Sequence, residues 1–220
     1  MRYFPVFLDL KEKICVVIGG GRVAERKVLN LMKAGARVIV VAPQVTEGLR
    51  RLKEKGKITI RRGSFRATDL KTASLVIAAT DNRQTNEKIF QKASDLRIPV
   101  NVVDDPDHCS FIVPSVISRG DILLAISTGG QSPALAKSLR EKLQREIGPE
   151  YVVLLRILAA VRRKILPLGW GAKEKQKIFH HLLREDLLGL IRKKRGADVE
   201  ALVEKIAGFK ISAADIGLES

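Results

Sequence analysis

The chain has 220 residues, of which 45% are hydrophobic and 5% aromatic, and its basic residues exceed its acidic ones enough to give a formal net charge of +16. This length predicts one large domain with a smaller appendage, and no apolar run approaches the roughly 20 residues of a membrane span. A basic surface suits polyanionic ligands, whereas the scarcity of aromatic residues argues against a platform for single-stranded nucleic acid.

The first strong pattern lies at residues 14–24, which read ICVVIGGGRVA. The apolar, β-branched run predicts a buried strand, and residues 23–33 predict a helix. Between them, Gly19, Gly21 and Ala24 form the dinucleotide-binding fingerprint: Gly19 permits the turn, Gly21 leaves room for a pyrophosphate, and Ala24 packs helix on strand. The helix N-terminus would offer free N–H groups to the phosphates. A tight turn without a ligand is the alternative, but the strand–turn–helix context favours a cofactor.

Strand and helix patterns then alternate as far as residue 104. Strands are expected at residues 37–42, 58–62, 75–79 and 99–103, and helices at 45–55 and from a cap at 80–82 to about residue 96. Residues 3–10 are expected to form a short strand or an extended arm. This alternation predicts an α/β fold, a Rossmann-like parallel sheet with helices on both faces.

The pattern changes after residue 104. Two strand-like runs, 110–117 and 121–127, are joined by a connection too short for a parallel crossover, so an antiparallel pair is expected. Ser132 and Pro133 begin a helix of about 15 residues, with proline at its first position. Beyond residue 149 only helical patterns follow, at residues 151–166, 172–184, 185–194 and 198–207. We therefore expect a nucleotide-binding Rossmann domain at 1–113, a strand–helix segment at 114–148 and a helical C-terminal domain at 149–220.

The end of the second strand bears on the choice of cofactor. An acidic residue commonly holds the ribose of NAD at this point, but the strand ends with Pro43 and Gln44 and no carboxylate. Arg22 and Arg37 would suit NADP instead. These residues alone leave the choice between NAD and NADP open, with Pro43 and Gln44 expected beside the adenosine half.

Polar residues also follow the fourth and fifth strands, at the edge where such sheets bind ligands. Thr80 and Asp81 are either part of a helix cap or cofactor contacts. Asp104 and Asp105 precede Pro106, so they are either turn residues or carboxylates able to move protons. Spacing alone does not decide between these alternatives.

The histidines and cysteines bear on two questions: whether the chain binds a metal, and in which cellular compartment it works. His108 and Cys109 are adjacent, but no further ligand occurs at the spacing of a zinc site, so no structural metal is expected. His180 lies with His181 in a basic helix and is expected on a solvated face. The two cysteines, Cys15 and Cys109, fit a reducing environment, and the N-terminus lacks the features of a signal peptide. We expect a cytoplasmic protein.

Several segments together resemble the siroheme synthase family in its dehydrogenase/chelatase module. The matching segments are residues 19–27, 34–36, 78–81, 101–104 and 127–136, with further matches at 4–10 and 138–143. The resemblance covers about residues 1–148. It implies a precorrin-2 dehydrogenase that uses NAD to make sirohydrochlorin, with ferrous iron insertion as a further activity of some members. It also implies an intertwined homodimer formed through the segment after the nucleotide domain.

The resemblance assigns roles by position. It places Gly21, Arg22 and Val23 at the pyrophosphate, Pro43 and Gln44 at the adenosine, Asp104 as the functional carboxylate, and the loop Ser127, Thr128, Gly129 and Gly130 in the tetrapyrrole cavity. Basic residues expected near that loop, as partners of the substrate carboxylates, are Arg119, Lys137 and Arg140. Some family members carry a phosphorylated serine where this chain has Thr128. The methyltransferase module of the long fused members is not in this sequence, so a separate protein is expected to supply precorrin-2.

Two alternatives to the bifunctional enzyme stand beside this interpretation. One is a dehydrogenase without chelatase activity, because one cavity would serve both reactions. The other is a nucleotide-sensing or nucleic-acid-binding regulator that uses the basic helical tail. It predicts salt-sensitive DNA binding and no turnover.

Overall fold

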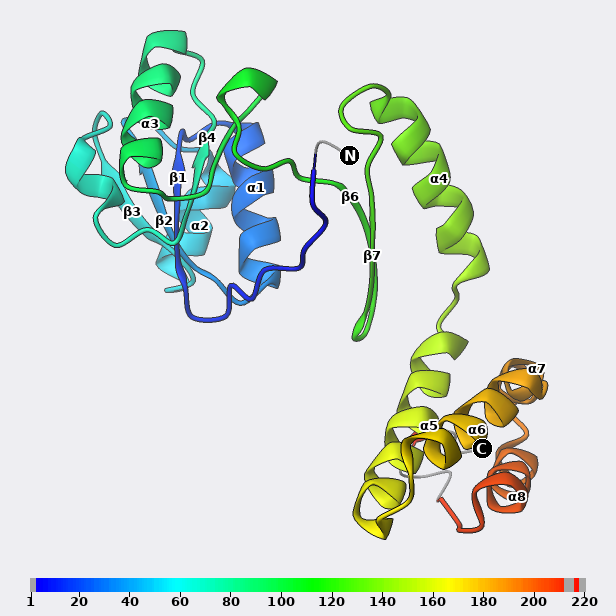
Figure 1. Ribbon diagram of the computed structural model, residues 1–220. Coiled ribbons are helices and arrows are strands. Elements are labelled where there is room, and N and C mark those ends of the chain that lie inside the picture. Colours follow the sequence, from blue (N-terminus) through cyan, green and yellow to red (C-terminus); the bar gives the residue numbers. More distant parts are fainter. Residues whose placement is uncertain (1–2, 212–215, 218–220) are drawn as a thin grey trace. The chain divides into compact units, whose positions relative to one another are not determined.

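The computed structural model describes residues 3–211 and 216–217 (Figure 1). Residues 1–2 of the expected Rossmann domain lie outside this range, as do residues 212–215 and 218–220 of the expected helical C-terminal domain. By its internal contacts the chain forms two compact units, Met1–Val113 and Pro114–Ser220. A further division of the second unit at residue 148 stays a prediction.

The first unit is a parallel five-stranded sheet, as expected for a Rossmann-like fold. Its strands are β1 (Ile14–Ile18), β2 (Arg37–Ala42), β3 (Thr59–Arg62), β4 (Leu75–Ala78) and β5 (Val100–Val102). They are ordered β3-β2-β1-β4-β5. The order reverses between β1 and β4, so the chain leaves these two strands in opposite directions and opens a crevice at their carboxyl ends.

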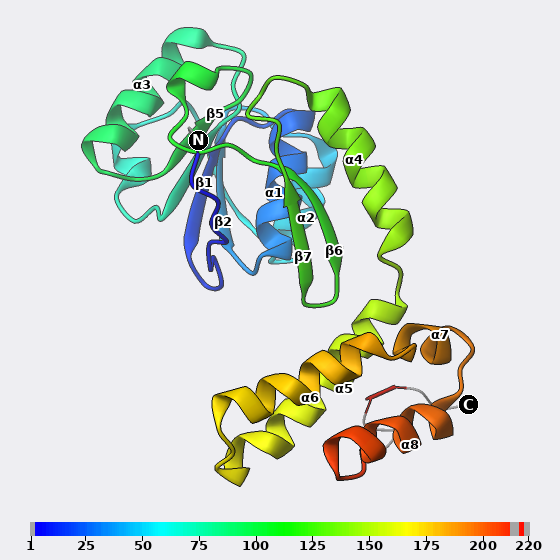
Figure 2. The same cartoon turned by 45° about the vertical axis from the view of Figure 1, so that its right-hand side comes forward.

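Helices cover both faces of this sheet because its strands are apolar on both sides. In β1, Cys15 and Val17 face a core with α1 (Arg22–Lys33) and α2 (Glu47–Glu54). Val16 and Ile18 face the opposite core with α3 (Arg83–Asp95) and the short turn η1 (Ala67–Leu70). Cys15 is fully buried, and burial raises the pKa of its thiol to about 11. Figure 2 shows the sheet between its two helical layers.

The N-terminal arm, residues 3–10, is extended and forms no strand in its described part. Its apolar residues Phe4, Val6, Phe7 and Leu8 are all exposed. Of the two expectations for this segment, the arm is confirmed.

The second unit begins with an antiparallel hairpin, β6 (Ser115–Arg119) and β7 (Ile122–Ile126). The antiparallel pairing is confirmed, but β6 starts later than the expected residue 110. The reason lies in the first unit, where Cys109 forms a bridge with Asn101 and Ser110 donates its N–H to Val100. These residues extend the edge of β5 instead of the hairpin.

Helices make up the rest of the second unit: α4 (Pro133–Glu146), α5 (Glu150–Ile165), α6 (Ala172–Arg184), α7 (Leu187–Arg192) and α8 (Gly196–Ala207). A short turn, η3 (Leu166–Leu168), follows α5, and another, η2 (Pro106–His108), follows β5 in the first unit. Ser132 caps α4 by accepting the N–H of Leu135, as the sequence predicts. Helix α7 starts two residues later than expected, because Asp186 accepts the N–H of Gly189 and so caps the helix.

Helices α5 to α8 enclose an apolar core of their own. Ile157, Val161 and Ile165 of α5 are buried against Leu182 of α6 and residues of α7 and α8. Leu154 of α5 is also buried inside this core. Within the part of the chain that the structure describes, no helix combines the length and apolarity needed to cross a membrane.

Candidate functional site

The glycine turn after β1 is held in close backbone contact with its neighbours. Gly19 has φ +124°, and a Cβ there would lie 2.1 Å from the carbonyl oxygen of Ala79 at the end of β4. A Cβ on Gly20 would lie 1.9 Å from the carbonyl oxygen of Gln44, after β2. Only glycine fits at either position. The sequence prediction gave Gly20 no task, although three successive glycines are a signal that a second close approach is present.

Gly21 differs, since a Cβ there would meet nothing within 4 Å. It is the N-cap of α1, and the first bond of the helix runs from the Glu25 N–H to the Gly21 carbonyl. The N–H groups of Arg22, Val23 and Ala24 therefore have no acceptor within the helix, and glycine has no side chain to cap them. Open space before unpaired N–H groups at a helix N-terminus fits a pyrophosphate, so these residues are suited to hold NAD.

The loop after β2 is joined to this turn. Thr46 donates its N–H to the Gly20 carbonyl at 2.9 Å, and its hydroxyl donates to Oε2 of Glu25 at 2.6 Å. Pro43 and Gln44 are exposed beside this junction, where the adenosine half is expected. The sequence prediction missed Glu25 and Thr46, whose contact depends on the packing of α1 against α2.

The residues after β4 divide between a cap and a pocket. Asn82 is the cap of α3 and accepts the N–H of Thr85. The hydroxyl of Thr80 donates to Oδ1 of Asn86 at 2.7 Å, and Nδ2 of Asn86 donates to the Thr80 carbonyl at 2.9 Å. Asp81 is exposed and lines the pocket described next. Thr80 thus forms hydrogen bonds with the backbone and with the buried amide of Asn86, whereas the Asp81 side chain lines the pocket and can contact a ligand.

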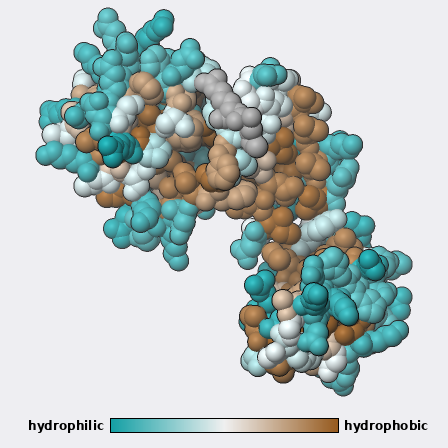
Figure 3. All heavy atoms as spheres, in the orientation of Figure 1, coloured by the Kyte–Doolittle hydropathy of each residue, from teal (hydrophilic) through white to brown (hydrophobic). Residues whose placement is uncertain are grey.

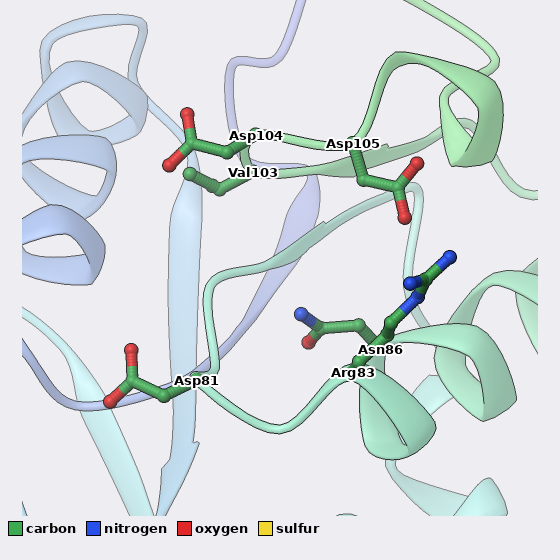
Figure 4. Close-up of a pocket in the computed structure, with 6 residues that line it drawn as sticks. All are labelled: Asp81, Arg83, Asn86, Val103, Asp104 and Asp105. Carbon is green, nitrogen blue, oxygen red and sulfur yellow. The ribbon is translucent and has the colours of Figure 1, made fainter.

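A pocket of about 390 Å³ lies at the carboxyl ends of β4 and β5, lined by Asp81, Arg83, Asn86, Val103, Asp104 and Asp105 (Figure 4). The carboxylates of Asp104 and Asp105 point to opposite sides in this view, and Asp105 points toward Arg83. Asp104 has φ +60°, a left-handed conformation that aspartate tolerates better than most residues. The pocket therefore brings together two site residues predicted from different strands, Asp81 and Asp104.

Two pKa shifts in the structure involve these aspartates. Burial lowers the pKa of Lys27 on α1, as does the charge of Arg26, while the charges of Asp104 and Cys109 raise it. The hydrogen bond from His108 holds the pKa of Asp105 below its ordinary value, and the charge of Arg83 adds to this effect. The sequence prediction gave Lys27 no role. Lys27 lies one helical turn after Val23, so the two side chains share a face of the helix that follows the fingerprint. This spacing is the signal from which the sequence could have placed Lys27 near the site.

His108 and Cys109 both have hydrogen-bonding partners within the protein. Nδ1 of His108 contacts Asp105 at 2.8 Å, and Sγ of Cys109 accepts hydrogen bonds from the Val102 N–H and from Asn101. Residues 3–211 and 216–217 contain no group of three or more His, Cys, Asp or Glu side chains able to hold a metal ion.

The loop Ser127–Gly130 lies in the second unit, between β7 and α4. Thr128 is held by its hydroxyl, which donates to the Ser132 carbonyl and accepts the Ser132 N–H. Gly129 and Gly130 have φ of +64° and +88°, with nothing near either Cβ position. The Gly129 N–H donates to the hydroxyl of Ser127. The loop therefore has space beside the backbone of Gly129 and Gly130, next to the Thr128 hydroxyl that two hydrogen bonds hold in place.

The basic residues expected near this loop are not all placed there. Arg119 pairs with Ile122 at the turn of the hairpin, whereas the loop follows the other end of β7. Its Nε donates to the Ile147 carbonyl at 3.4 Å. The expectation that Arg119 lies beside the loop is wrong, because an antiparallel hairpin puts its turn and its open end a full strand apart. Lys137 and Arg140 lie on α4, which begins at the loop.

Lys137 and Arg140 differ in how closely neighbouring side chains hold them. Lys137 is 71% exposed, with a long contact of 3.9 Å to Glu141, whereas Arg140 donates to Gln144 and Glu141.

Comparison with known proteins follows the same division of the chain. Residues 6–115 match the model of an NAD(P)-binding family, and residues 119–146 match the model of the central region of sirohaem biosynthesis proteins. The chain belongs to the siroheme synthase family. Its relatives include the siroheme synthase of Nitrosococcus oceani, 38% identical over 204 residues, which are 93% of this chain and 44% of the relative. The siroheme synthase of Nitrosospira multiformis is 48% identical over 155 residues, 69% of this chain and 33% of the relative.

The chain spans less than half the length of these curated relatives. Among solved structures, it resembles SirC, a precorrin-2 dehydrogenase, with a TM-score of 0.75 and 26% identity, over 94% of this chain and 100% of that chain. The alternative of a nucleic-acid-binding regulator receives no support from these comparisons.

Proposed function

We propose that the chain is an NAD-dependent precorrin-2 dehydrogenase of siroheme biosynthesis that works in the cytoplasm as a homodimer. The observation that carries the proposal is the position of Asp104, whose carboxylate lines a pocket at the same edge of the sheet as the glycine turn. The likeness to SirC over nearly the whole chain supports it. The net charge of +16 suits a substrate that is a polycarboxylate tetrapyrrole.

The cofactor's place follows from the turn after β1. The N–H groups of Arg22 and Val23, with Gly21 clear of any Cβ, would hold the pyrophosphate. Pro43 and Gln44 would flank the adenosine. When bound, NAD supplies the acceptor for the hydride. The protein's own task is to place the tetrapyrrole and to handle the proton.

Asp104 is proposed to take that proton. Its backbone has a left-handed conformation, and its side chain lines the pocket. Ser127, Thr128, Gly129 and Gly130 would line the tetrapyrrole cavity, with Lys137 and Arg140 as partners of its carboxylates. Arg119 is kept as a candidate for the same role from the hairpin turn.

The homodimer is supported by exposed apolar residues in the β6–β7–α4 segment. Val116 and Leu123 of the hairpin are 47% and 49% exposed, and Leu135 and Leu139 of α4 are 51% and 39% exposed. Figure 3 shows apolar side chains gathered over this part of the second unit. A contiguous exposed apolar surface is typical of an interaction site.

Iron insertion at the same pocket is a second candidate activity. Three carboxylates, Asp81, Asp104 and Asp105, line the pocket. Carboxylate oxygens can accept the protons that pyrrole N–H groups release when iron enters. Ferrous iron would be a substrate here, not a resident cofactor.

An anaerobic coupled assay tests the proposal. Precorrin-2 is generated in place by a separate methyltransferase, and reduced nicotinamide and the sirohydrochlorin spectrum are followed together, with NAD and NADP in parallel. We expect both signals to rise with NAD. Ferrous iron is then added to sirohydrochlorin without NAD, to measure chelation by itself. Tight, salt-sensitive DNA binding without turnover would overturn the enzyme assignment.

Asp104→Asn is the variant that tests the carboxylate, and Asp107→Asn in the same loop is its control, since Asp107 does not line the pocket. We expect Asp104→Asn to lower kcat about 100-fold, within the range for loss of a general base, and Asp107→Asn to leave it unchanged. Full dehydrogenase and chelatase rates in Asp104→Asn would exclude the proposed proton transfer.

A further inference from the structure

The loop after β2 contains no carboxylate of its own, but α1 supplies one to it. In Rossmann folds an acidic residue at this strand end commonly holds the ribose of NAD, and residues 43–46 include none. Glu25, in the first turn of α1, accepts a hydrogen bond of 2.6 Å from the hydroxyl of Thr46 in this loop. The packing of α1 against the loop therefore brings a negative charge to the end of β2 from a residue that precedes β2 in the chain.

The Glu25 carboxylate is held in one place by its neighbours. The Thr46 hydroxyl that donates to its Oε2 also accepts the N–H of Leu49 and so caps α2. A Cβ on Gly48 would lie 1.9 Å from Oε1 of Glu25, so a larger residue there would displace the carboxylate. The loop is in turn fixed to the glycine turn by the bond from the Thr46 N–H to the Gly20 carbonyl.

The charge of Glu25 differs from that of its neighbour Glu47 in having no ion-pair partner among the residues that the structure describes. The carboxylate of Glu47 contacts Arg50 at 2.7 Å and Arg51 at 3.4 Å. Arginines of its own helix therefore balance the charge of Glu47, whereas the charge of Glu25 acts on a ligand that binds beside the loop.

Positive charge is also present at this edge of the sheet. Arg22 begins α1, and Arg62 ends β3 beside Ala42 in the strand register. Both arginines are exposed, and they would attract an additional phosphate. Arg37 lies elsewhere, because it opens β2 and its Nε donates to Glu12 at 2.6 Å. The expectation that Arg37 would suit NADP is therefore wrong, since a full strand separates it from the cofactor edge.

NAD and NADP differ by one phosphate, on the 2′-hydroxyl of the adenosine ribose, which lies near the end of the second strand in Rossmann folds. We propose that Glu25, held by Thr46, makes this site select NAD over NADP. The carboxylate repels the 2′-phosphate and offsets the attraction of Arg22 and Arg62, whereas the uncharged ribose of NAD meets no such repulsion. This inference rests on the proposed function, because it takes the glycine turn as the NAD site.

Glu25→Gln tests the selection, because glutamine has the same length and can still accept the Thr46 hydroxyl through its amide oxygen, but carries no charge. The affinities of the full chain for NAD and NADP are measured by calorimetric titration. We expect NADP to bind about tenfold more tightly in Glu25→Gln than in the wild type, and NAD affinity to stay unchanged.

Glu47→Gln is the matched control for this variant. It changes the net charge by the same amount in the next residue along the loop, but its carboxylate is already paired with Arg50 and Arg51. We expect both affinities to remain those of the wild type. A gain in NADP affinity equal to that of Glu25→Gln would mean that net charge alone sets the preference, and would overturn the assignment to Glu25.

Two nucleotide fragments locate the effect at the ribose and need only the wild-type protein. Adenosine 2′,5′-bisphosphate and adenosine 5′-monophosphate differ by the same 2′-phosphate and lack the nicotinamide half. We expect the monophosphate to bind more tightly, and added salt to narrow the difference, because salt screens the repulsion between exposed charges. Tighter binding of the bisphosphate at low salt would contradict the selection.

The outcomes separate the selection from the proposed function. Unchanged NADP affinity in Glu25→Gln, or an equal loss of both affinities, would leave Glu25 as a structural link between α1 and α2 and overturn the selection alone. Preference of the wild type for NADP would do the same. Failure of the wild type to bind either dinucleotide would instead overturn the proposed function, and the selection with it.

Discussion

The sheet unit, Met1–Val113, and the helical region, α5 to α8, use their polar residues differently. In the sheet unit, glycine backbone and carboxylates converge where parallel strands end, at the turn after β1 and the pocket after β4 and β5. In the helical region, charged residues lie mainly on outward faces over a closed apolar core. Parallel strands bring their carboxyl ends to one edge, so polar groups distant in sequence meet there. Packed helices bury one face each and leave the other to solvent.

This difference implies that binding and stability are separable between the two regions. Changes at the strand ends should alter NAD binding, and changes in the helical core should alter unfolding alone. The predictions below test that separation, from the largest expected effect to the smallest.

The largest effect is expected at the glycine turn. Gly19→Ala places a Cβ 2.1 Å from the Ala79 carbonyl oxygen at a φ of +124°, so the end of β4 must move. We expect NAD affinity to fall at least about 100-fold, or about 2.8 kcal/mol, as measured by calorimetric titration.

Gly21→Ala sharpens this test, because the same methyl group meets nothing within 4 Å there. The thermal stability of the free protein should stay unchanged, while NAD affinity falls because the methyl occupies the approach of the pyrophosphate. Wild-type NAD affinity in both variants would mean that the turn does not hold the cofactor.

In the helical region, the largest effect is expected from the core of α5. Ile157 is fully buried, so Ile157→Ala leaves a cavity and should lower the free energy of unfolding by about 2–5 kcal/mol. NAD affinity should remain that of the wild type. Denaturant unfolding followed by circular dichroism measures the first quantity, with the exposed Arg162→Ala as control. A matching loss of NAD affinity would contradict the separation of the two regions.

The two regions also differ in how far the sequence predicted them. The periodic patterns predicted the strands of the sheet and the helices α5 to α8 to within a few residues, because burial repeats locally along each element. The fingerprint located the turn, and the strand ends located Asp81 and Asp104. These features depend on neighbours in sequence, which a single chain displays directly.

What the sequence did not predict depends on register and packing. The contact of Gly20 with Gln44, the effect of Asp104 on the pKa of Lys27, and the pairing of Thr46 with Glu25 all join separate elements. Arg119 was expected beside the loop at Ser127, and only the hairpin register shows that it lies at the opposite end. No local pattern states which residues face each other across such contacts.

The smallest effect is expected from an ion pair of the helical region, between Glu150 at the start of α5 and Arg192 at the end of α7. Two guanidinium nitrogens donate to Oε1 of Glu150, at 2.9 and 2.6 Å. Burial raises the pKa of Glu150, but the bonds from Arg192 outweigh it and the net direction is downward. A lowered pKa in the folded state gives stability that is present above the unfolded pKa of glutamate. That stability is lost as pH falls through the folded value.

Because the Arg192 side chain is 56% exposed, solvent screening limits this contribution to about 1 kcal/mol or less. Glu150→Gln should therefore lower stability slightly at neutral pH and make the unfolding free energy less dependent on pH below about pH 5, near the ordinary range of carboxyl groups. Urea titrations at several pH values measure this slope. NAD affinity should not change with it, since the pair lies in the region that has no part in the proposed cofactor site. An acid-induced loss of NAD affinity in the wild type that Glu150→Gln removes would show that α5 and α7 are coupled to the sheet unit.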